Sequence, residues 1–197
     1  MTALPQPQSP QPPSHPLTID EYAALGEDEH GRTELQEGSL VMSPSPTPNH
    51  MITSMHLAMQ LLPQVPGDLQ VIPDIDVDLG LVPRDQPGSA RRPDLIVVKR
   101  TEVERVEAEG GILRASELIL VVEIVSLGSR RIDNVIKRHE YADAGIPHYW
   151  IVDIERPVSL VACHLTEEFG YQDSGAVSGT WDTADPFAAR IDLAELH

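Results

Sequence analysis

The sequence predicts a fold of the α/β (α+β) class, in which a mixed β-sheet is flanked by helices. Two dense apolar runs rich in β-branched residues, 95–98 and 118–125, have the composition of central strands buried on both faces. A segment with helical periodicity follows the second run, and another apolar run, 148–152, follows that helix. Strands before and after a helix are typical of a mixed α/β sheet.

Length and composition indicate one folded domain. The chain has 197 residues, with 41% hydrophobic and 23% charged residues, which excludes disorder over its whole length. Residues 1–16 contain six prolines among Gln and Ser, so we expect a disordered Pro/Gln-rich tail there. We expect residues 17–197 to form a single domain.

The formal charge of −17 and the single cysteine restrict the function classes. Cys163 alone excludes an internal disulfide framework and a thiolate zinc site, which favours a cytoplasmic protein. The sequence shows neither a membrane-spanning apolar run nor the features of a secretory signal, so we expect no membrane partner. An acidic chain is repelled by nucleic acid on average and needs a local basic patch to bind it.

The first elements are predicted by their caps and turns. Thr18 with Glu21 forms a capping-box pattern, which predicts a short helix. A Glu37-Gly38 turn inside 32–42 favours a β-hairpin and places Glu34 on a strand.

A longer helix is predicted from Thr47, a candidate N-cap, with Pro48 in the first turn. Apolar residues then recur at three- and four-residue spacing, which indicates an amphipathic helix with a Met-rich buried face; His50 and Ser54 would project elsewhere. The residues expected on the buried face are Met51, Ile52, Met55, Ala58, Met59 and Leu62.

The middle of the chain alternates strands with charged segments. Residues 69–79 alternate aliphatic and acidic side chains, which predicts a half-buried strand with a solvated acidic face; the spacing does not fit a calcium-binding EF-hand loop. Residues 102–109 are expected to form a charged loop or hairpin.

The last third begins with a helix that Ser129 can cap and that Gly145 and Pro147 end. Strands are expected at 148–152 and 158–164, with a short amphipathic piece at 191–196. One side of this helix is expected to carry Ile132, Val135, Ile136 and His139 or Glu140.

Two carboxylates, Asp94 and Glu123, interrupt the apolar central strands. Burying a carboxylate costs several kcal/mol unless cations or hydrogen-bond donors compensate it. Taken singly, Asp94 fits a strand-end residue that reaches water, and Glu123 fits a carboxylate paired with an arginine. Taken together, they can bind one hard divalent cation such as Mg²⁺, which usually takes one or two carboxylates.

Positive side chains are concentrated near these two acids. Lys137 lies on the helix after the Glu123 strand, and Asp133, four residues earlier, shares its helical face. Eight of the fourteen positive residues fall in the windows 91–100 and 130–138, which fits either a phosphate-bearing substrate or a solvated charged face. The candidate nucleic-acid contacts are Arg91, Arg92, Arg130 and Arg131.

Other chemistries lack their motifs. Ser126 has no nucleophile elbow around it. The sequence contains no Gly-rich phosphate loop, so we expect no nucleotide cofactor.

Several motifs together resemble the Uma-two family of restriction-endonuclease-like proteins. They include Arg-Arg-Pro-Asp-Leu-Ile-Val-Val around Asp94, Val-Val-Glu-Ile-Val-Ser around Glu123, and the segment 145–153. The resemblance implies the PD-(D/E)XK nuclease fold, with Mg²⁺ or Mn²⁺ bound by Asp94, Glu123 and the main-chain carbonyl of Ile124. It also gives Glu34 an accessory metal contact and matches His50, whose role it leaves open.

The simple PD-(D/E)XK motif has a lysine where this chain has Val125. Lys137 matches a lysine of the family's own pattern and is expected to supply the ammonium, with Asp133 holding it in place. The expected function is Mg²⁺-dependent hydrolysis of nucleic acid, with DNA as substrate, by a metal-activated water in a homodimer. The alternatives are a catalytically inactive module that binds nucleic acid or a protein, and hydrolysis of some other ester.

Overall fold

The computed structural model of the chain describes residues 15–25, 32–43, 45–125 and 132–196. Of the tail expected at 1–16, only residues 15 and 16 fall within these ranges. The helices are α1 (Ile19–Leu25), α2 (Pro48–Leu61), α3 (Arg100–Glu109), α4 (Arg138–Asp143), the π-helical turn η2 (Ile132–Lys137) and the short 3-10 turns η1 (Ala115–Glu117) and η3 (Leu193–Glu195). Within the described ranges, no helix combines the length and apolar character needed to cross a membrane.

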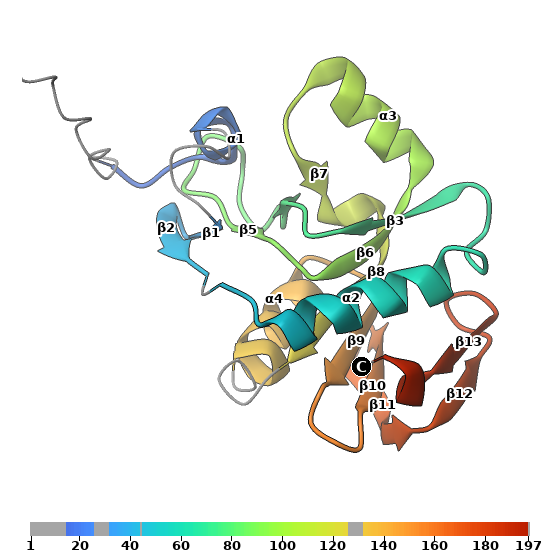
Figure 1. Cartoon of the computed structure of the whole chain (residues 1–197). Helices are drawn as coiled ribbons and strands as arrows, with labels where there is room; N and C mark the ends of the chain where they lie inside the picture. Colours follow the sequence, from blue (N-terminus) through green and yellow to red (C-terminus); the bar gives the residue numbers. More distant parts are fainter. Residues whose placement is uncertain (1–14, 26–31, 44, 126–131, 197) are drawn as a thin grey trace, which may run out of the picture.

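The strands form a mixed central sheet, as predicted. Six strands lie in the order β11-β10-β9-β8-β6-β3, with β8 parallel to β9 and the other neighbours antiparallel. A smaller sheet, β2-β1-β5-β4-β7, and a hairpin, β12-β13, lie beside it (Figure 1). The strands are β1 (Thr33–Gln36), β2 (Ser39–Met42), β3 (Leu69–Pro73), β4 (Val77–Asp78), β5 (Ala90–Arg91), β6 (Leu95–Lys99), β7 (Leu113–Arg114), β8 (Leu118–Val125), β9 (His148–Asp153), β10 (Ser159–Thr166), β11 (Gly170–Ser178), β12 (Thr180–Thr183) and β13 (Ala189–Asp192).

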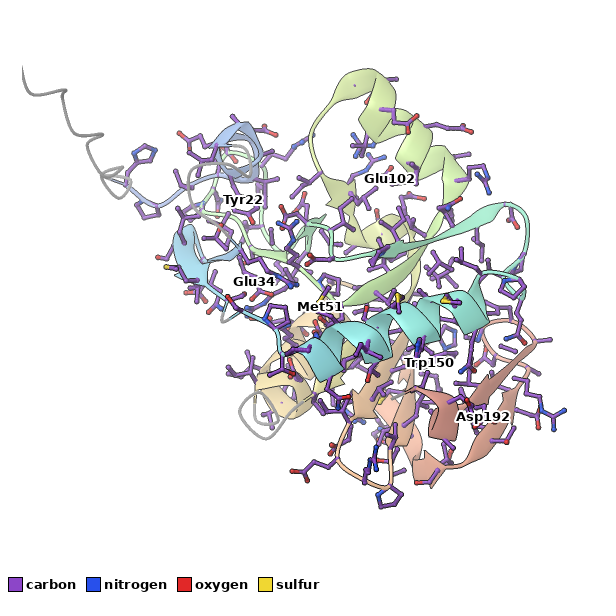
Figure 2. All side chains as sticks on the ribbon, in the orientation of Figure 1. Tyr22, Glu34, Met51, Glu102, Trp150 and Asp192 are labelled. Carbon is purple, nitrogen blue, oxygen red and sulfur yellow. The ribbon has the colours of Figure 1, made fainter. Side chains whose placement is uncertain are left out.

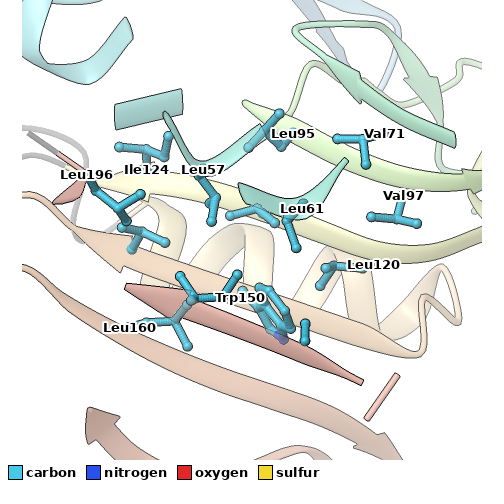
Figure 3. Close-up of a cluster of buried hydrophobic side chains, with 14 of the residues drawn as sticks. Leu57, Leu61, Val71, Leu95, Val97, Leu120, Ile124, Trp150, Leu160 and Leu196 are labelled. Carbon is cyan, nitrogen blue, oxygen red and sulfur yellow. The ribbon is translucent and has the colours of Figure 1, made fainter. Parts of the chain in front are cut away.

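Each face of the central sheet packs against its own hydrophobic core. On one face, Leu57 and Leu61 of α2 and residues of β13 pack on alternate residues of β6 and β8 (Figure 3). On the other face, the intervening residues of the same strands pack against α3, α4, β4 and β7. Because both faces are covered, β6 and β8 are apolar except for Lys99 and Glu123, which explains the two dense runs in the sequence.

The caps predicted at Thr18 and Thr47 and the turn predicted at Glu37-Gly38 are confirmed. Thr18 and Glu21 form the capping box, with the Thr18 N–H donating to Glu21 Oε2 at 2.8 Å and the Glu21 N–H donating to Thr18 Oγ1 at 3.3 Å. The strands β1 and β2 pair around the Glu37-Gly38 turn, where both residues have positive φ. Thr47 caps α2 by accepting a hydrogen bond from the His50 N–H.

Two segments differ from the predictions. The strand expected over 69–79 is broken between β3 and β4 near Asp74, whose φ is 50°. Its acidic side chains are not simply solvated, because Asp74 and Asp76 pair with Arg92. The charged segment expected as a loop or hairpin forms the helix α3, in which Glu102 is buried and paired with Arg105 and Arg114.

The orientation predicted for α2 is wrong. Its buried positions are Thr53, Ser54, Leu57 and Leu61, whereas the methionines and their apolar neighbours face outward. Both sides of this helix carry apolar residues, so periodicity could not identify the side that packs on the sheet. The residues expected to be buried but found exposed are Met51, Ile52, Met55, Met59 and Leu62.

The apolar side of the helix after β8 faces outward. Ile132, Val135 and Ile136 are between 45% and 50% exposed, whereas Asp133, Lys137 and Tyr141 are buried. The polar side of this helix faces inward for an electrostatic reason, because the Lys137 ammonium compensates buried carboxylates. The expected cap, Ser129, lies outside the described residues.

Candidate active site

A cavity of about 430 Å³ opens between the β1–β2 hairpin, the start of α2, the end of β8 and η2. Both carboxylates singled out in the sequence line it, together with the predicted lysine. Its polar and charged lining residues are Arg32, Glu34, Gln36, Ser43, Ser45, Thr47, His50, Arg91, Arg92, Asp94, Glu123, Asp133 and Lys137.

Asp94 and Glu123 are brought together by strand register. Leu95 pairs with Val122 in the antiparallel β6–β8 ladder, so Asp94, one residue before β6, lies opposite Glu123. Opposite residues of an antiparallel pair point to the same face with Cβ atoms about 4.5–5.5 Å apart. Both residues are at least nine-tenths buried.

One carboxylate oxygen of Asp94 has two partners. Its Oδ2 accepts a hydrogen bond from the Ile124 N–H at 2.7 Å and lies 3.1 Å from His50 Nε2. Its main-chain carbonyl accepts the Ser54 hydroxyl at 3.4 Å. The hydrogen bond and charge of Asp94 raise the pKa of His50, in spite of the opposing effect of burial.

The Ile124 backbone presents polar groups to the same place. In a strand, the N–H and C=O of one residue point to the same neighbouring strand. Since the Ile124 N–H reaches Asp94, its carbonyl faces the Asp94 side of β8 as well. The Ile124 side chain packs in the opposite core.

Lys137 lies at the centre of the acidic cluster. Its Nζ is 2.8 Å from Glu123 Oε1 and 3.5 Å from both Glu34 Oε1 and Asp133 Oδ1. Burial alone would lower the pKa of Lys137, but these three carboxylates outweigh it and raise the pKa. The ammonium is therefore held in its charged form.

Glu123 is the most strongly perturbed acid of the site. Burial raises its pKa to about 8, and the charge of Asp94 adds to the rise while Lys137 opposes it. The Tyr141 hydroxyl also donates to Glu123 Oε1 at 2.6 Å. Burial raises the pKa of Tyr141 far above its usual value, so this hydroxyl stays protonated and remains a donor.

Glu34 is held by Arg91, which also binds Glu140. Arg91 donates to Glu34 Oε2 at 2.6 Å and makes a two-point contact with Glu140 at 2.7 and 2.6 Å. Burial alone would raise the pKa of Glu34, but Lys137 and Arg91 outweigh it and lower the pKa. Figure 2 shows Glu34 on β1, the strand that brings it to the cavity.

The arginines expected to contact nucleic acid have different positions. Arg91 lines the cavity but is only 1% exposed, and its guanidinium pairs with Glu34 and Glu140. Arg92 lines the cavity, and its Nε donates to Asp74 at 3.1 Å. Arg130 and Arg131 lie outside the described residues.

Sequence reasoning missed three parts of this site. Arg32 lines the cavity and pairs with Asp74, Tyr141 bonds Glu123, and Glu140 anchors Arg91. Only Tyr141 had a usable signal, because it lies four residues after Lys137 on the same helical face.

The donor set fits a hard divalent cation. Two neighbouring buried carboxylates and the Ile124 carbonyl offer only oxygen atoms, the ligands that Mg²⁺ and Mn²⁺ prefer. Among the described residues, no group of three or more His, Cys, Asp or Glu side chains is arranged to hold a metal ion. An ion here would therefore depend on Asp94, Glu123, the carbonyl and water.

Comparison with known proteins agrees with this geometry. The family model "Uma2: Putative restriction endonuclease" matches residues 19–191. A crystal structure from Anabaena variabilis, described as a "putative nuclease belonging to DUF820", is similar with a TM-score of 0.66 at 17% identity, covering 92% of this chain and 97% of that one. At this identity the similarity shows a shared fold, which confirms the predicted fold class. A search of curated proteins found no match.

Proposed function

The chain belongs to the Uma2 family, whose description is "Putative restriction endonuclease". From that premise we propose that it is a Mg²⁺- or Mn²⁺-dependent nuclease that hydrolyses DNA. Asp94, Glu123 and the main-chain carbonyl of Ile124 would hold the ion. A divalent ion in such a site supplies an activated water and stabilises the charge that develops on a phosphodiester.

One observation carries this proposal: two buried carboxylates face each other across neighbouring strands at the wall of an open cavity. Asp94 and Glu123 lie opposite each other in the register of β6 and β8, so their negative charges repel each other in addition to the contacts that each makes with its donors. A divalent cation between them would remove that repulsion.

Lys137 is the proposed partner of the reacting water. Val125, which occupies the position of the usual strand lysine, is buried in the core and cannot supply a charge. The Lys137 ammonium reaches Glu123 from η2 instead, at 2.8 Å. From there it can orient a water at the cavity wall and stabilise negative charge on a phosphate.

Glu34 and Asp133 act as positioning residues in this proposal. Both lie 3.5 Å from the Lys137 Nζ, and Arg91 fixes Glu34 from the other side. The long lysine side chain is thereby confined near the metal-binding carboxylates. His50 would hold Asp94 through its 3.1 Å contact.

The test is a cleavage assay on single- and double-stranded DNA and RNA with Mg²⁺, Mn²⁺ or EDTA. We expect cutting of DNA with either metal and none with EDTA, and we expect its loss in Asp94→Asn and in Glu123→Gln. Asp182→Asn is a matched control, because Asp182 is an exposed acid on β12 that pairs with Arg190.

The other possible results of this assay would each change or refute the proposal. Binding without cutting in every metal would favour the inactive binding module, and cutting that persists in EDTA would refute the metal site. Cutting of RNA alone would correct the substrate. The proposal includes a homodimer, since one site of this kind cuts one strand and two-fold pairs are the commonest assemblies.

A further inference from the structure

The outward side of α2 carries an apolar stripe that no described element covers. We define this stripe as Met51, Met55, Met59 and Leu62, which are between 44% and 63% exposed. Their spacing of four, four and three residues places them on one face of the helix. Figure 1 shows α2 lying across the molecule with its outer side open, and Figure 2 labels Met51 on it.

Soluble monomers rarely expose contiguous apolar patches, and larger patches mark interaction sites. Methionine is common at such surfaces because its flexible thioether adapts to a partner. Val41, Met42 and Ile132, which line the cavity together with Thr47, the N-cap of α2, are exposed apolar residues as well.

The charge pattern limits what can bind there. No Asp, Glu, Lys or Arg occurs from residue 43 to residue 67, although the chain has 45 such residues and a net charge of −17. Nucleic acid and anionic membranes need Lys or Arg at the contact, and this segment has none. Two copies of an acidic chain repel each other, and an uncharged segment is where they can approach at the lowest cost.

The stripe is also self-complementary. Met55 and Met59 lie two positions on either side of Leu57, and Met51 and Leu62 lie six and five positions from it. A two-fold axis level with Leu57 would place Met55 against Met59 of the partner subunit. It would also place Met51 against Leu62 of the partner subunit, as an isologous interface requires.

We propose that a second copy of this chain docks on the stripe, with the two α2 helices antiparallel about Leu57. This inference does not rest on the nuclease activity, because none of the four stripe residues belongs to the cavity lining. It identifies the surface through which a homodimer would form.

Sedimentation velocity at micromolar concentration tests the proposal. We expect the wild-type chain to be a dimer. Met55→Glu/Met59→Glu should raise the dissociation constant of the dimer by at least about a hundredfold, because the introduced charges would face apolar side chains and one another. The control is Val82→Glu, an equally drastic change at a 39% exposed residue between β4 and β5. That variant should remain a dimer.

A charge-pair rescue tests the antiparallel register. Met55→Lys alone and Met59→Glu alone should both dimerise weakly, whereas an equimolar mixture should form a heterodimer, since the ammonium introduced at position 55 of one copy would face the carboxylate introduced at position 59 of the other. Far-ultraviolet circular dichroism and melting curves establish that each variant is folded. A monomeric wild-type chain, a dimer that survives the double substitution, or a mixture no tighter than its components would each overturn the proposal.

Discussion

Removal of the Lys137 charge should affect stability far more than removal of the chain's other lysine charge. In Lys137→Met, a side chain of similar length replaces an ammonium within 3.5 Å of three buried carboxylates. Breaking a buried pair by removing one partner typically costs about 3–5 kcal/mol. Tyr141 still donates to Glu123 and Arg91 still pairs with Glu34, so we expect the lower end of that range.

The matched control is Lys99→Met. Lys99 pairs with Glu117 at 3.0 Å, but its side chain is 47% exposed, and exposed pairs are worth about 0–1 kcal/mol. For a domain of this size, each kcal/mol shifts the melting temperature by about 2–4 °C. A loss of about 3 kcal/mol therefore predicts a drop of about 6–12 °C in Lys137→Met and at most about 4 °C in Lys99→Met.

Differential scanning calorimetry in EDTA measures both variants under the same conditions, and the nuclease assay is run on the same samples. Lys137→Met should also lose about 10²–10⁴ in cleavage rate, the usual range for an acid–base or charge-stabilising group, whereas Lys99→Met should keep its activity. Equal melting temperatures in the two variants would refute the internal charge network. Full activity in Lys137→Met would refute the catalytic role.

Three further predictions follow from the structure. Mg²⁺ at a hundred times its dissociation constant should stabilise the wild-type chain by about 2.7 kcal/mol, and the rise in melting temperature should vanish in Asp94→Asn; an equal rise in both proteins would exclude the shared site. Arg91→Met should destabilise the fold by about 3–5 kcal/mol in urea unfolding, whereas Arg84→Met, at an exposed ion pair, should cost at most about 1 kcal/mol; similar costs would contradict the buried position of Arg91. Burial alone would raise the pKa of Glu102, but hydrogen bonds from two arginines lower it to about 2. A carboxyl group with a lowered pKa stabilises the fold at a pH above its unfolded pKa of about 4.5, and this stabilisation is lost as the pH falls toward 2. Glu102→Gln should therefore destabilise the fold near pH 7 and have little effect on stability near pH 2. A stability difference between wild type and variant that does not change with pH would refute this prediction.

The central strands and the two carboxylates were predictable because buried strands have a distinctive composition. Asp94 and Glu123 are conspicuous as charged residues next to or within apolar runs, and their register in the sheet places them together. The resemblance to the Uma-two family added Ile124 and matched Lys137 to a lysine of the family's pattern, and the family is now confirmed. The structure places the Lys137 ammonium beside Glu123, as its helical position suggested.

The orientations of α2 and of the helix after β8 were not predictable from periodicity. In α2, the buried Leu57 and Leu61 compete with an equally apolar stripe on the other side, and hydrophobicity alone does not rank the two sides. After β8, the buried side is the polar one, because Lys137 has to meet carboxylates contributed by β1 and β8. Such long-range charge pairing leaves no trace in a local pattern.

The position of Arg91 illustrates the same limit. Next to Arg92 and close to Asp94, it has the sequence context of a substrate contact. Its partners Glu34 and Glu140 lie 57 and 49 residues away, and only the fold brings them to it. Both arginines of this run line the cavity, but Arg91 is buried and pairs with Glu34 and Glu140, whereas Arg92 pairs with Asp74.

The most direct measurement is the anomalous diffraction of crystals grown with Mn²⁺. We predict one anomalous peak per chain, bound by the carboxylates of Asp94 and Glu123 and by the carbonyl of Ile124, with the Lys137 ammonium close by, and no peak in Asp94→Asn crystals. A peak held by other residues, or no peak at a Mn²⁺ concentration that supports cleavage, would contradict the proposed metal site.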